Sequence, residues 1–139
     1  MKRFEELVNT NHKGKKELAE FVNIPVTLVY KWLNNETNPS FKNLILIADF
    51  YEISVDYLVG RTEDDSSVKT KILIPFDENV KTILKTKHIT KYRMFKDCGF
   101  SDGHEFSWFT LKNLPRYDNL IKMADYLNVS MDELMGRVI

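Results

Sequence analysis

Basic side chains are concentrated in one part of this sequence. Residues 81–96 contain six Lys and Arg residues and no Asp or Glu, whereas Glu63, Asp64 and Asp65 form an acidic cluster upstream. Clustered ammonium and guanidinium groups are the chemistry that binds phosphate, so this stretch is a candidate anion-binding face. A helix face with ordinary solvated lysines is the alternative interpretation, because the whole chain has no net charge.

Side chains that perform catalysis are few and scattered. The three histidines, His12, His88 and His104, have no partners at a spacing typical of metal ligands or of a nucleophile and its base, and Cys98 is the single cysteine. The sequence also has no Gly-rich phosphate-binding loop. We therefore expect no enzymatic activity, no catalytic residue, no metal site and no cofactor.

The composition is that of a helical globular protein. The chain has 43% hydrophobic and 29% charged residues, with only five Gly and four Pro among 139 residues. No apolar run approaches the ~18 residues of a membrane span, and the charged first residues do not form a secretory signal. We expect a cytoplasmic protein without membrane contact, and a single cysteine fits that reducing compartment.

Two parts of the chain repeat each other. A shift of 76 residues aligns 43–61 with 119–137 without a gap, and ten of these nineteen positions are identical. Further upstream the same shift aligns Trp32 with Trp108, and both are expected to be core residues. Self-similarity of this kind predicts two related domains. It also pairs His12 with His88, which we expect to be exposed at the end of a first helix.

The repeat sets the expected domain boundaries. We place a first domain at residues 1–61, a short, partly extended linker at 62–76 and a diverged second domain at 77–139. The end of the linker, Ile72–Phe76, is too apolar for a free tether. We expect it to pack against one domain or to form a short strand.

Apolar periodicity predicts an all-α fold with five helices in each domain. Pro25 suits the start of the third helix, Ser54 can cap the fifth, and Gly60 and Gly136 suit left-handed helix ends. In the first domain the helices are expected around residues 4–8, at 15–22, 26–33 and 40–51, and from 54 onward.

Five segments of the first domain carry a family signature: Glu17–Phe21, Ile24–Asn34, Asn38–Ser40, Leu44–Phe50 and Ile53–Arg61. Their residues and order resemble the lambda-repressor-like helix-turn-helix family, also called Xre or Cro-like. The resemblance covers nearly all of the first domain and implies two tandem domains of this fold. It implies that the second and third helices cross closely at the small Ala19, while Val29 and Trp32 fill the core beneath the third helix.

The resemblance further implies that the third helix lies in the major groove of double-stranded DNA. By position in the motif, the base-reading residues are Val26, Thr27, Tyr30 and Lys31. Lys31 suits guanine O6 or N7, Thr27 can hydrogen-bond a base or a phosphate, and Val26 offers an apolar contact for a thymine methyl group.

Contacts to the DNA backbone come, in similar proteins, from the start of the second helix and the loop after the third. This sequence departs from the family there, with Lys15 in place of the usual glutamine and Asn35 in place of the usual glycine. Asparagine tolerates a left-handed conformation less readily than glycine. The phosphate ligands implied here are Lys15, Lys16, Asn34, Asn35 and Lys42.

The second domain departs further from the family pattern. Phe95 replaces the small alanine, Glu105 replaces the buried valine, and phosphates would repel an aspartate at the first reading position. A role in dimerisation, in binding a partner protein or in nonspecific phosphate binding is therefore the alternative to base reading. Its reading positions are Asp102, Gly103, Phe106 and Ser107, and its candidate phosphate ligands are Lys91, Arg93 and Lys96.

Two functions from different classes fit this sequence. The first is a sequence-specific transcriptional regulator of the phage-repressor type, from a phage or mobile element, that binds DNA as a homodimer. The second is a protein-binding module, such as an antirepressor or inhibitor, that keeps the scaffold without reading an operator. The zero net charge favours the second, whereas the lysines of the first domain favour the first. A protein partner is expected on the second domain.

Overall fold

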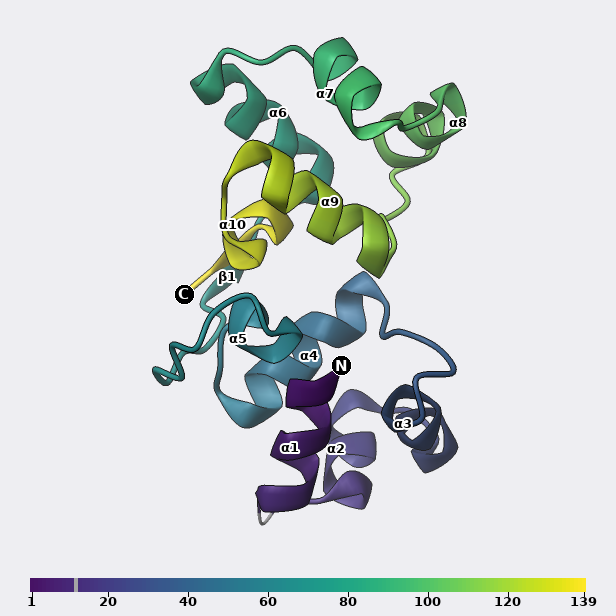
Figure 1. The fold of residues 1–139 in the computed structure, drawn as a ribbon, viewed down its shortest axis with the longest axis vertical. Helices are drawn as coiled ribbons and strands as arrows, with labels where there is room; N and C mark the ends of the chain where they lie inside the picture. The colour runs from purple at the N-terminus through teal and green to yellow at the C-terminus, as the bar shows by residue number, and fades with distance from the viewer. Residues whose placement is uncertain (12) are drawn as a thin grey trace. The chain divides into compact units, whose positions relative to one another are not determined.

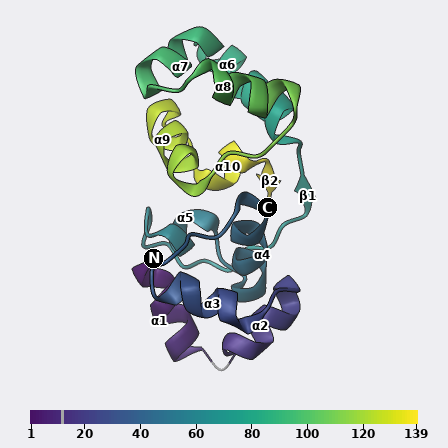
Figure 2. The ribbon, with the colours of Figure 1, turned by 90° about the vertical axis from the view of Figure 1, so that its right-hand side faces the viewer.

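The computed structural model describes residues 1–11 and 13–139, and that part of the chain is mostly helical (Figures 1 and 2). The chain divides into two compact units. Unit 1 comprises residues 1–70 and Ile139, and unit 2 comprises residues 71–138. Across the described ranges, no helix combines the length and the apolar character that crossing a membrane requires.

Unit 1 contains the helices that the apolar periodicity predicts. Their bounds are α1 (Lys2–Thr10), α2 (Lys15–Val22), α3 (Val26–Leu33), α4 (Phe41–Tyr51) and α5 (Val55–Val59). The predicted ranges of α2 and α3 are confirmed. The Ser54 hydroxyl accepts a hydrogen bond from the Tyr57 N–H at 2.9 Å, so the predicted cap of α5 is also confirmed. Gly60 ends α5 with a φ of 83°, as predicted.

The core of unit 1 lies where α1, α2 and α3 meet α4 and α5. Helix α2 contacts both α3 and α4, while α1 contacts α5. Trp32 is 2% exposed and meets the Phe4 ring edge-on at a centroid distance of 6.1 Å, so its predicted role as a core residue is confirmed. Ala19 and Val29 are also buried, which lets α2 and α3 approach closely.

Unit 2 follows the same order of elements in most of its length. It contains β1 (Ile72–Leu73), α6 (Phe76–Lys87), α7 (Lys91–Cys98), α8 (Asp102–Glu105), the π-helix η1 (Phe106–Thr110), α9 (Tyr117–Leu127), α10 (Met131–Met135) and β2 (Arg137–Val138). A shift of 76 residues converts the bounds of α2, α4 and α5 into those of α7, α9 and α10. Helix α10 contacts α6 and α9, as α5 contacts α1 and α4 in unit 1.

The third helix position differs between the units. Where unit 1 has the eight-residue α3, unit 2 has a four-residue α8 followed by η1. Phe95 is buried at the alanine position, and its ring lies 5.7 Å from that of Trp108 and 6.2 Å from that of Phe109. The wide π turn allows Trp108 and Phe109 to enter the core together. Unit 2 therefore departs from the expected five regular helices.

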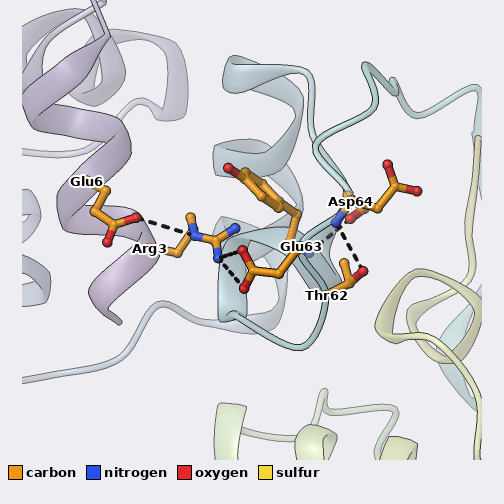
Figure 3. Close-up of polar contacts among 7 residues, drawn as sticks. Arg3, Glu6, Thr62, Glu63 and Asp64 are labelled. Atoms are coloured by element: carbon orange, nitrogen blue, oxygen red, sulfur yellow. Dashed lines mark hydrogen bonds and ion pairs between the residues drawn. The ribbon is translucent and has the colours of Figure 1, made fainter.

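The first part of the predicted linker is attached to unit 1. Figure 3 shows Arg3 of α1 between Glu6 and Glu63. The Arg3 guanidinium donates to both carboxylate oxygens of Glu63, at 2.9 and 3.0 Å, and lies 4.0 Å from the centre of the Tyr57 ring. These bonds and the ring contact attach the segment to α1 and α5, although the ion pair itself contributes little because the Glu63 side chain is 88% exposed.

Further along, the same segment bonds to α4. The Val68 N–H donates to the Glu52 carbonyl at 2.9 Å, and the Thr70 N–H and hydroxyl both donate to an Asp49 carboxylate oxygen. Residues 62–70 are thus packed against unit 1.

The second part of the predicted linker belongs to unit 2. The predicted short strand is confirmed as β1, which pairs antiparallel with β2 in the register Ile72↔Val138 and Leu73↔Arg137. Phe76 is already the first residue of α6. The expected linker therefore divides between the two units.

Like Gly60, Gly136 has a positive φ, and unlike Gly60 it also has no space for a side chain; it joins α10 to β2. Its φ is 77°, and a Cβ there would lie 2.3 Å from the carbonyl oxygen of Ile74, whereas a Cβ at Gly60 would meet nothing within 4 Å. Gly136→Ala is expected to lower the free energy of unfolding by about 3 kcal/mol, and Gly60→Ala by about 1 kcal/mol. Urea unfolding followed by circular dichroism measures both. Equal losses would contradict the close approach of the Ile74 carbonyl.

The two units also carry ion pairs at repeat-equivalent positions. The Arg137–Asp132 pair measures 2.8 Å with side chains 0% and 7% exposed, whereas the side chains of the Arg61–Asp56 pair are 23% and 13% exposed. Asp132→Ala leaves the buried Arg137 without this carboxylate and is expected to cost about 3–5 kcal/mol. Asp56→Ala is expected to cost about 1–2 kcal/mol, because water reaches Arg61. Thermal unfolding of both variants measures the two losses of stability. A larger loss of stability for Asp56→Ala than for Asp132→Ala would refute this prediction.

Candidate nucleic-acid interface

The four predicted base-reading residues lie on one face of α3. Val26, Thr27, Tyr30 and Lys31 follow the spacing i, i+1, i+4 and i+5, which gathers them on the side opposite the buried core face. Thr27, Tyr30 and Lys31 are exposed, and Val26 is half-buried at the first turn. This face can present an ammonium group, two hydroxyls and a methyl pair to a ligand.

The start of α2 brings two lysines beside this face. The Glu17 carboxylate accepts a hydrogen bond from the Gly14 N–H at 3.0 Å, which closes the first turn of α2. Lys15 and Lys16 follow directly, and the Lys15 ammonium lies 5.2 Å from the centre of the Tyr30 ring. This cation–π distance links the predicted phosphate set on α2 to the predicted base-reading set on α3.

The loop after α3 carries two more predicted phosphate ligands. Asn34 follows the last residue of α3, and Asn35 adopts the left-handed conformation with a φ of 58°, so asparagine does occupy the conformation that favours glycine. Both are exposed, although the Asn35 side-chain oxygen accepts a bond from the Met1 ammonium at 3.0 Å. Lys42, the last of the predicted ligands, is exposed in the first turn of α4.

An open groove runs between α2 and the start of α3. Lys16, Glu20, Asn23, Pro25 and Val26 are among the residues that line it. Asn23 ends α2 in the left-handed conformation, with a φ of 62°, and so turns the chain into α3. Sequence reasoning missed Glu20, whose negative charge lies beside Val26. Its place four residues after Lys16, one helical turn along α2, was the signal that could have found it.

In unit 2, two of the three predicted phosphate ligands form ion pairs. The Lys91 ammonium lies 3.0 Å from the Glu105 carboxylate and 4.6 Å from the centre of the Phe109 ring. Arg93 pairs with Asp97 at 3.1 Å, one turn along α7. Glu105 is thus on the surface, whereas Val29, at the equivalent position of unit 1, is buried.

The Asp97 carboxylate is held in its charged form. The Tyr126 hydroxyl donates to it at 2.6 Å, and this bond, together with Arg93 and Lys96, lowers the pKa of Asp97 below its usual value. The carboxylate is therefore ionised at neutral pH and attracts both basic side chains. Phosphate binding by the unit 2 set stays a prediction.

Two of the three histidines lie among the described residues. The imidazole of His104 stacks on Trp108 at a centroid distance of 5.0 Å, and its Nδ1 lies 3.2 Å from the Ser101 N. His88 is exposed at the end of α6, as predicted, while His12 lies outside the described residues. Within the described ranges, no three His, Cys, Asp or Glu side chains are grouped so that they could hold a metal ion.

Comparisons with known proteins agree with the geometry of unit 1. A family model described as helix-turn-helix matches residues 12–58. A curated protein, the cryptic phage CTXphi transcriptional repressor RstR of Vibrio cholerae serotype O1, is 36% identical over 70 residues, which cover 48% of this chain and 62% of that protein. No solved structure matches the chain.

The matched range contains α2, the turn at Asn23, α3, all of α4 and most of α5. It includes no residue of unit 2, so a second helix-turn-helix domain stays a prediction from the internal repeat. The chain therefore carries a helix-turn-helix domain at residues 12–58.

Proposed function

We propose that the chain is a sequence-specific DNA-binding transcriptional regulator of the phage-repressor type, with α3 as its reading helix. One observation carries this proposal. The exposed face of α3 gathers Thr27, Tyr30 and Lys31, while the Lys15 ammonium lies against the Tyr30 ring. The helix-turn-helix match and the similarity to a phage transcriptional repressor support the same function.

The side chains on the outer face of α3 read the bases. Lys31 donates to guanine O6 or N7, which are the strongest acceptors in the major groove. The half-buried Val26 at the start of the helix contacts a thymine methyl group, and Thr27 bonds to a base edge or a phosphate. The Tyr30 ring, 47% exposed, packs against the sugar-phosphate backbone or a base.

The side chains around α3 bind the phosphates. Lys15, Lys16 and Lys42 supply charge, while Asn34 and Asn35 supply amide donors. Residues 1–70 contain nine Lys and Arg and eleven Asp and Glu. Affinity must therefore come from this local set, since the unit as a whole would not attract DNA.

The regulator acts as a symmetric dimer. One reading helix covers a half-site, and a two-fold protein reads a palindromic operator through two such helices about one turn of DNA apart. Two copies carry six of these lysines, which would neutralise about six phosphates. The slope of log K against log salt concentration is then about −5.

We infer that unit 2 is a diverged tandem copy of unit 1 that has lost base reading. The matched bounds of α7, α9 and α10 and the ten identities of the repeat support common descent. The acidic Asp102 at the first reading position and the ion pairs of Lys91 and Arg93 argue against a second reading helix. A weak phosphate contact through Lys96 remains part of the proposal.

A protein-binding module, such as an antirepressor, is the second candidate. The excess of acidic residues in unit 1 and the carboxylate of Glu20 in the groove beside α3 favour it. Such a module would contact its partner through the same face of α2 and α3. It would show no preference among DNA sequences.

The proposed division of roles predicts different effects for two lysines. Lys31→Ala is expected to relax base preference at one operator position, at a cost of about 1–3 kcal/mol on cognate DNA. Lys15→Ala is expected to weaken all duplexes alike and to make the salt slope shallower by about 2 in a two-copy complex. Fluorescence anisotropy with cognate and random duplexes across a salt series measures both.

Lys69→Ala provides the matched control for these titrations. It removes the same charge from unit 1 at an exposed lysine that pairs with Glu52, outside the predicted interface. It should leave affinity and salt slope unchanged. If Lys31→Ala and Lys15→Ala had equal effects on cognate and random DNA, the assignment of α3 as the reading helix would be wrong.

A further inference from the structure

The first helix of unit 2 carries exposed basic side chains that the corresponding helix of unit 1 lacks. Lys81 and Lys85 of α6 are exposed and lie one turn apart on the same face, and we call them the α6 lysine pair. The shift of 76 residues places Lys81 at the position of Glu5 and Lys85 at the position of Asn9. On this face, unit 2 therefore has two ammonium groups where unit 1 has an acidic and a neutral side chain.

The overall charges of the two units differ in the same direction. Residues 71–138 contain eleven Lys and Arg and nine Asp and Glu, whereas residues 1–70 contain nine Lys and Arg and eleven Asp and Glu. Basic residues at the end of α6 suit the negative end of the helix dipole. Lys81 lies in the middle of that helix, where the dipole gives no reason for a positive charge.

Phe109 brings the start of α7 beside the α6 lysine pair. The Lys81 ammonium lies 5.9 Å from the centre of the Phe109 ring, and the Lys91 ammonium lies 4.6 Å from the same centre. Both distances are within the range of a cation–π interaction. One ring therefore has lysines of two different helices around it, and it is itself 9% exposed.

Two carboxylates near these lysines are already neutralised. The Glu105 carboxylate lies 3.0 Å from the Lys91 ammonium. Asp77, one turn before Lys81 on α6, forms an ion pair with Lys112. Neither carboxylate therefore opposes the binding of an anion at the α6 lysine pair.

The α6 lysine pair keeps its own charges free. Among residues 1–11 and 13–139, no ion pair forms with Lys81 or Lys85, although Glu78 lies one turn before Lys81. Like charges at this spacing repel each other and weaken a helix slightly. A bound anion would remove that repulsion.

We propose that the α6 lysine pair binds the phosphate backbone of double-stranded DNA and gives unit 2 a sequence-independent contact. Four residues of an α-helix advance about 6 Å, so the two flexible side chains can each meet a different phosphate of one strand. Ammonium groups bind phosphates through charge and do not distinguish bases. This contact rests on the proposed function, because unit 1 is what brings the chain to DNA.

The contact increases the affinity of the whole chain for DNA. Because unit 2 is covalently joined to unit 1, its phosphate contact forms at the high effective concentration that such a linkage provides. Each neutralised phosphate steepens the slope of log K against log salt concentration by about 0.9. The α6 lysine pair therefore adds about −2 to the slope for each bound chain, beyond the slope that the lysines of unit 1 give.

Titration of random-sequence duplexes with the full chain across a salt series, followed by fluorescence anisotropy, tests this proposal. The double variant Lys81→Ala/Lys85→Ala is expected to bind at least tenfold more weakly at about 50 mM salt, with a slope shallower by about 2 for each bound chain. The variant Lys81→Arg/Lys85→Arg keeps both charges and should bind as the wild type does.

Lys71→Ala/Lys122→Ala is the matched control. It removes the same two charges from exposed lysines of unit 2, one before β1 and one in α9, and should change neither the affinity nor the slope. It therefore separates a phosphate contact from the general effect of net charge. Circular dichroism verifies that each variant is folded.

Three results would overturn the proposal. They are a folded Lys81→Ala/Lys85→Ala variant with the affinity and slope of the wild type, an equal loss of affinity in Lys71→Ala/Lys122→Ala, and an arginine variant that binds as weakly as the alanine variant. Because random duplexes contain no operator, these outcomes are independent of base reading. A chain whose variants behave as proposed but which prefers no DNA sequence would contradict the proposed function alone.

Discussion

The close packing of α2 against α3 is the constraint on which the rest of unit 1 depends. Ala19 is 5% exposed and small enough to let the two helices approach, and the left-handed Asn23 turns the chain between them. Val29 and Trp32 are then buried, which fixes the rotation of α3 about its axis. Once that rotation is fixed, Thr27 and Lys31 must point away from the core.

The residue at the position of Ala19 also explains why the third helix of unit 2 differs from α3. Phe95 is far larger than alanine, and its ring fills the place where a second helix would approach. In place of a regular third helix, unit 2 has the short α8 and a π-helix. Trp108 and Phe109 are buried in the core, while Phe106 stays exposed. A change in core packing has thus altered the surface. On our proposal, one copy of the scaffold reads DNA while the other has lost base reading.

Much of unit 1 follows from local patterns in the sequence. Several predicted features depend on residues within a few positions of each other. They are the bounds of α2 and α3, the cap at Ser54, the left-handed end at Gly60 and the buried Trp32. Such interactions are readable from spacing and residue type. The exposed faces follow, because the opposite face of an amphipathic helix has to be buried.

The features that escaped prediction depend on residues far apart in the chain. The segment 62–70 belongs to unit 1 through contacts between Arg3 and Glu63 and between Asp49 and Thr70, which are sixty and twenty-one positions apart and have no local signal. The substitutions at Phe95 and Glu105 were visible in the sequence, yet the π-helix depends on how several rings share one core. The Lys15–Tyr30 contact likewise needs the angle between two helices, which spacing does not provide.

The central claim is that α3 of unit 1 reads a DNA sequence. Selection of bound duplexes from a random pool by the full chain, followed by sequencing, tests it most directly. The account predicts a palindromic motif whose half-sites are about 10 base pairs apart, centre to centre. Weak, salt-sensitive retention of DNA with no enriched motif would contradict it and would favour a protein as the ligand of this face.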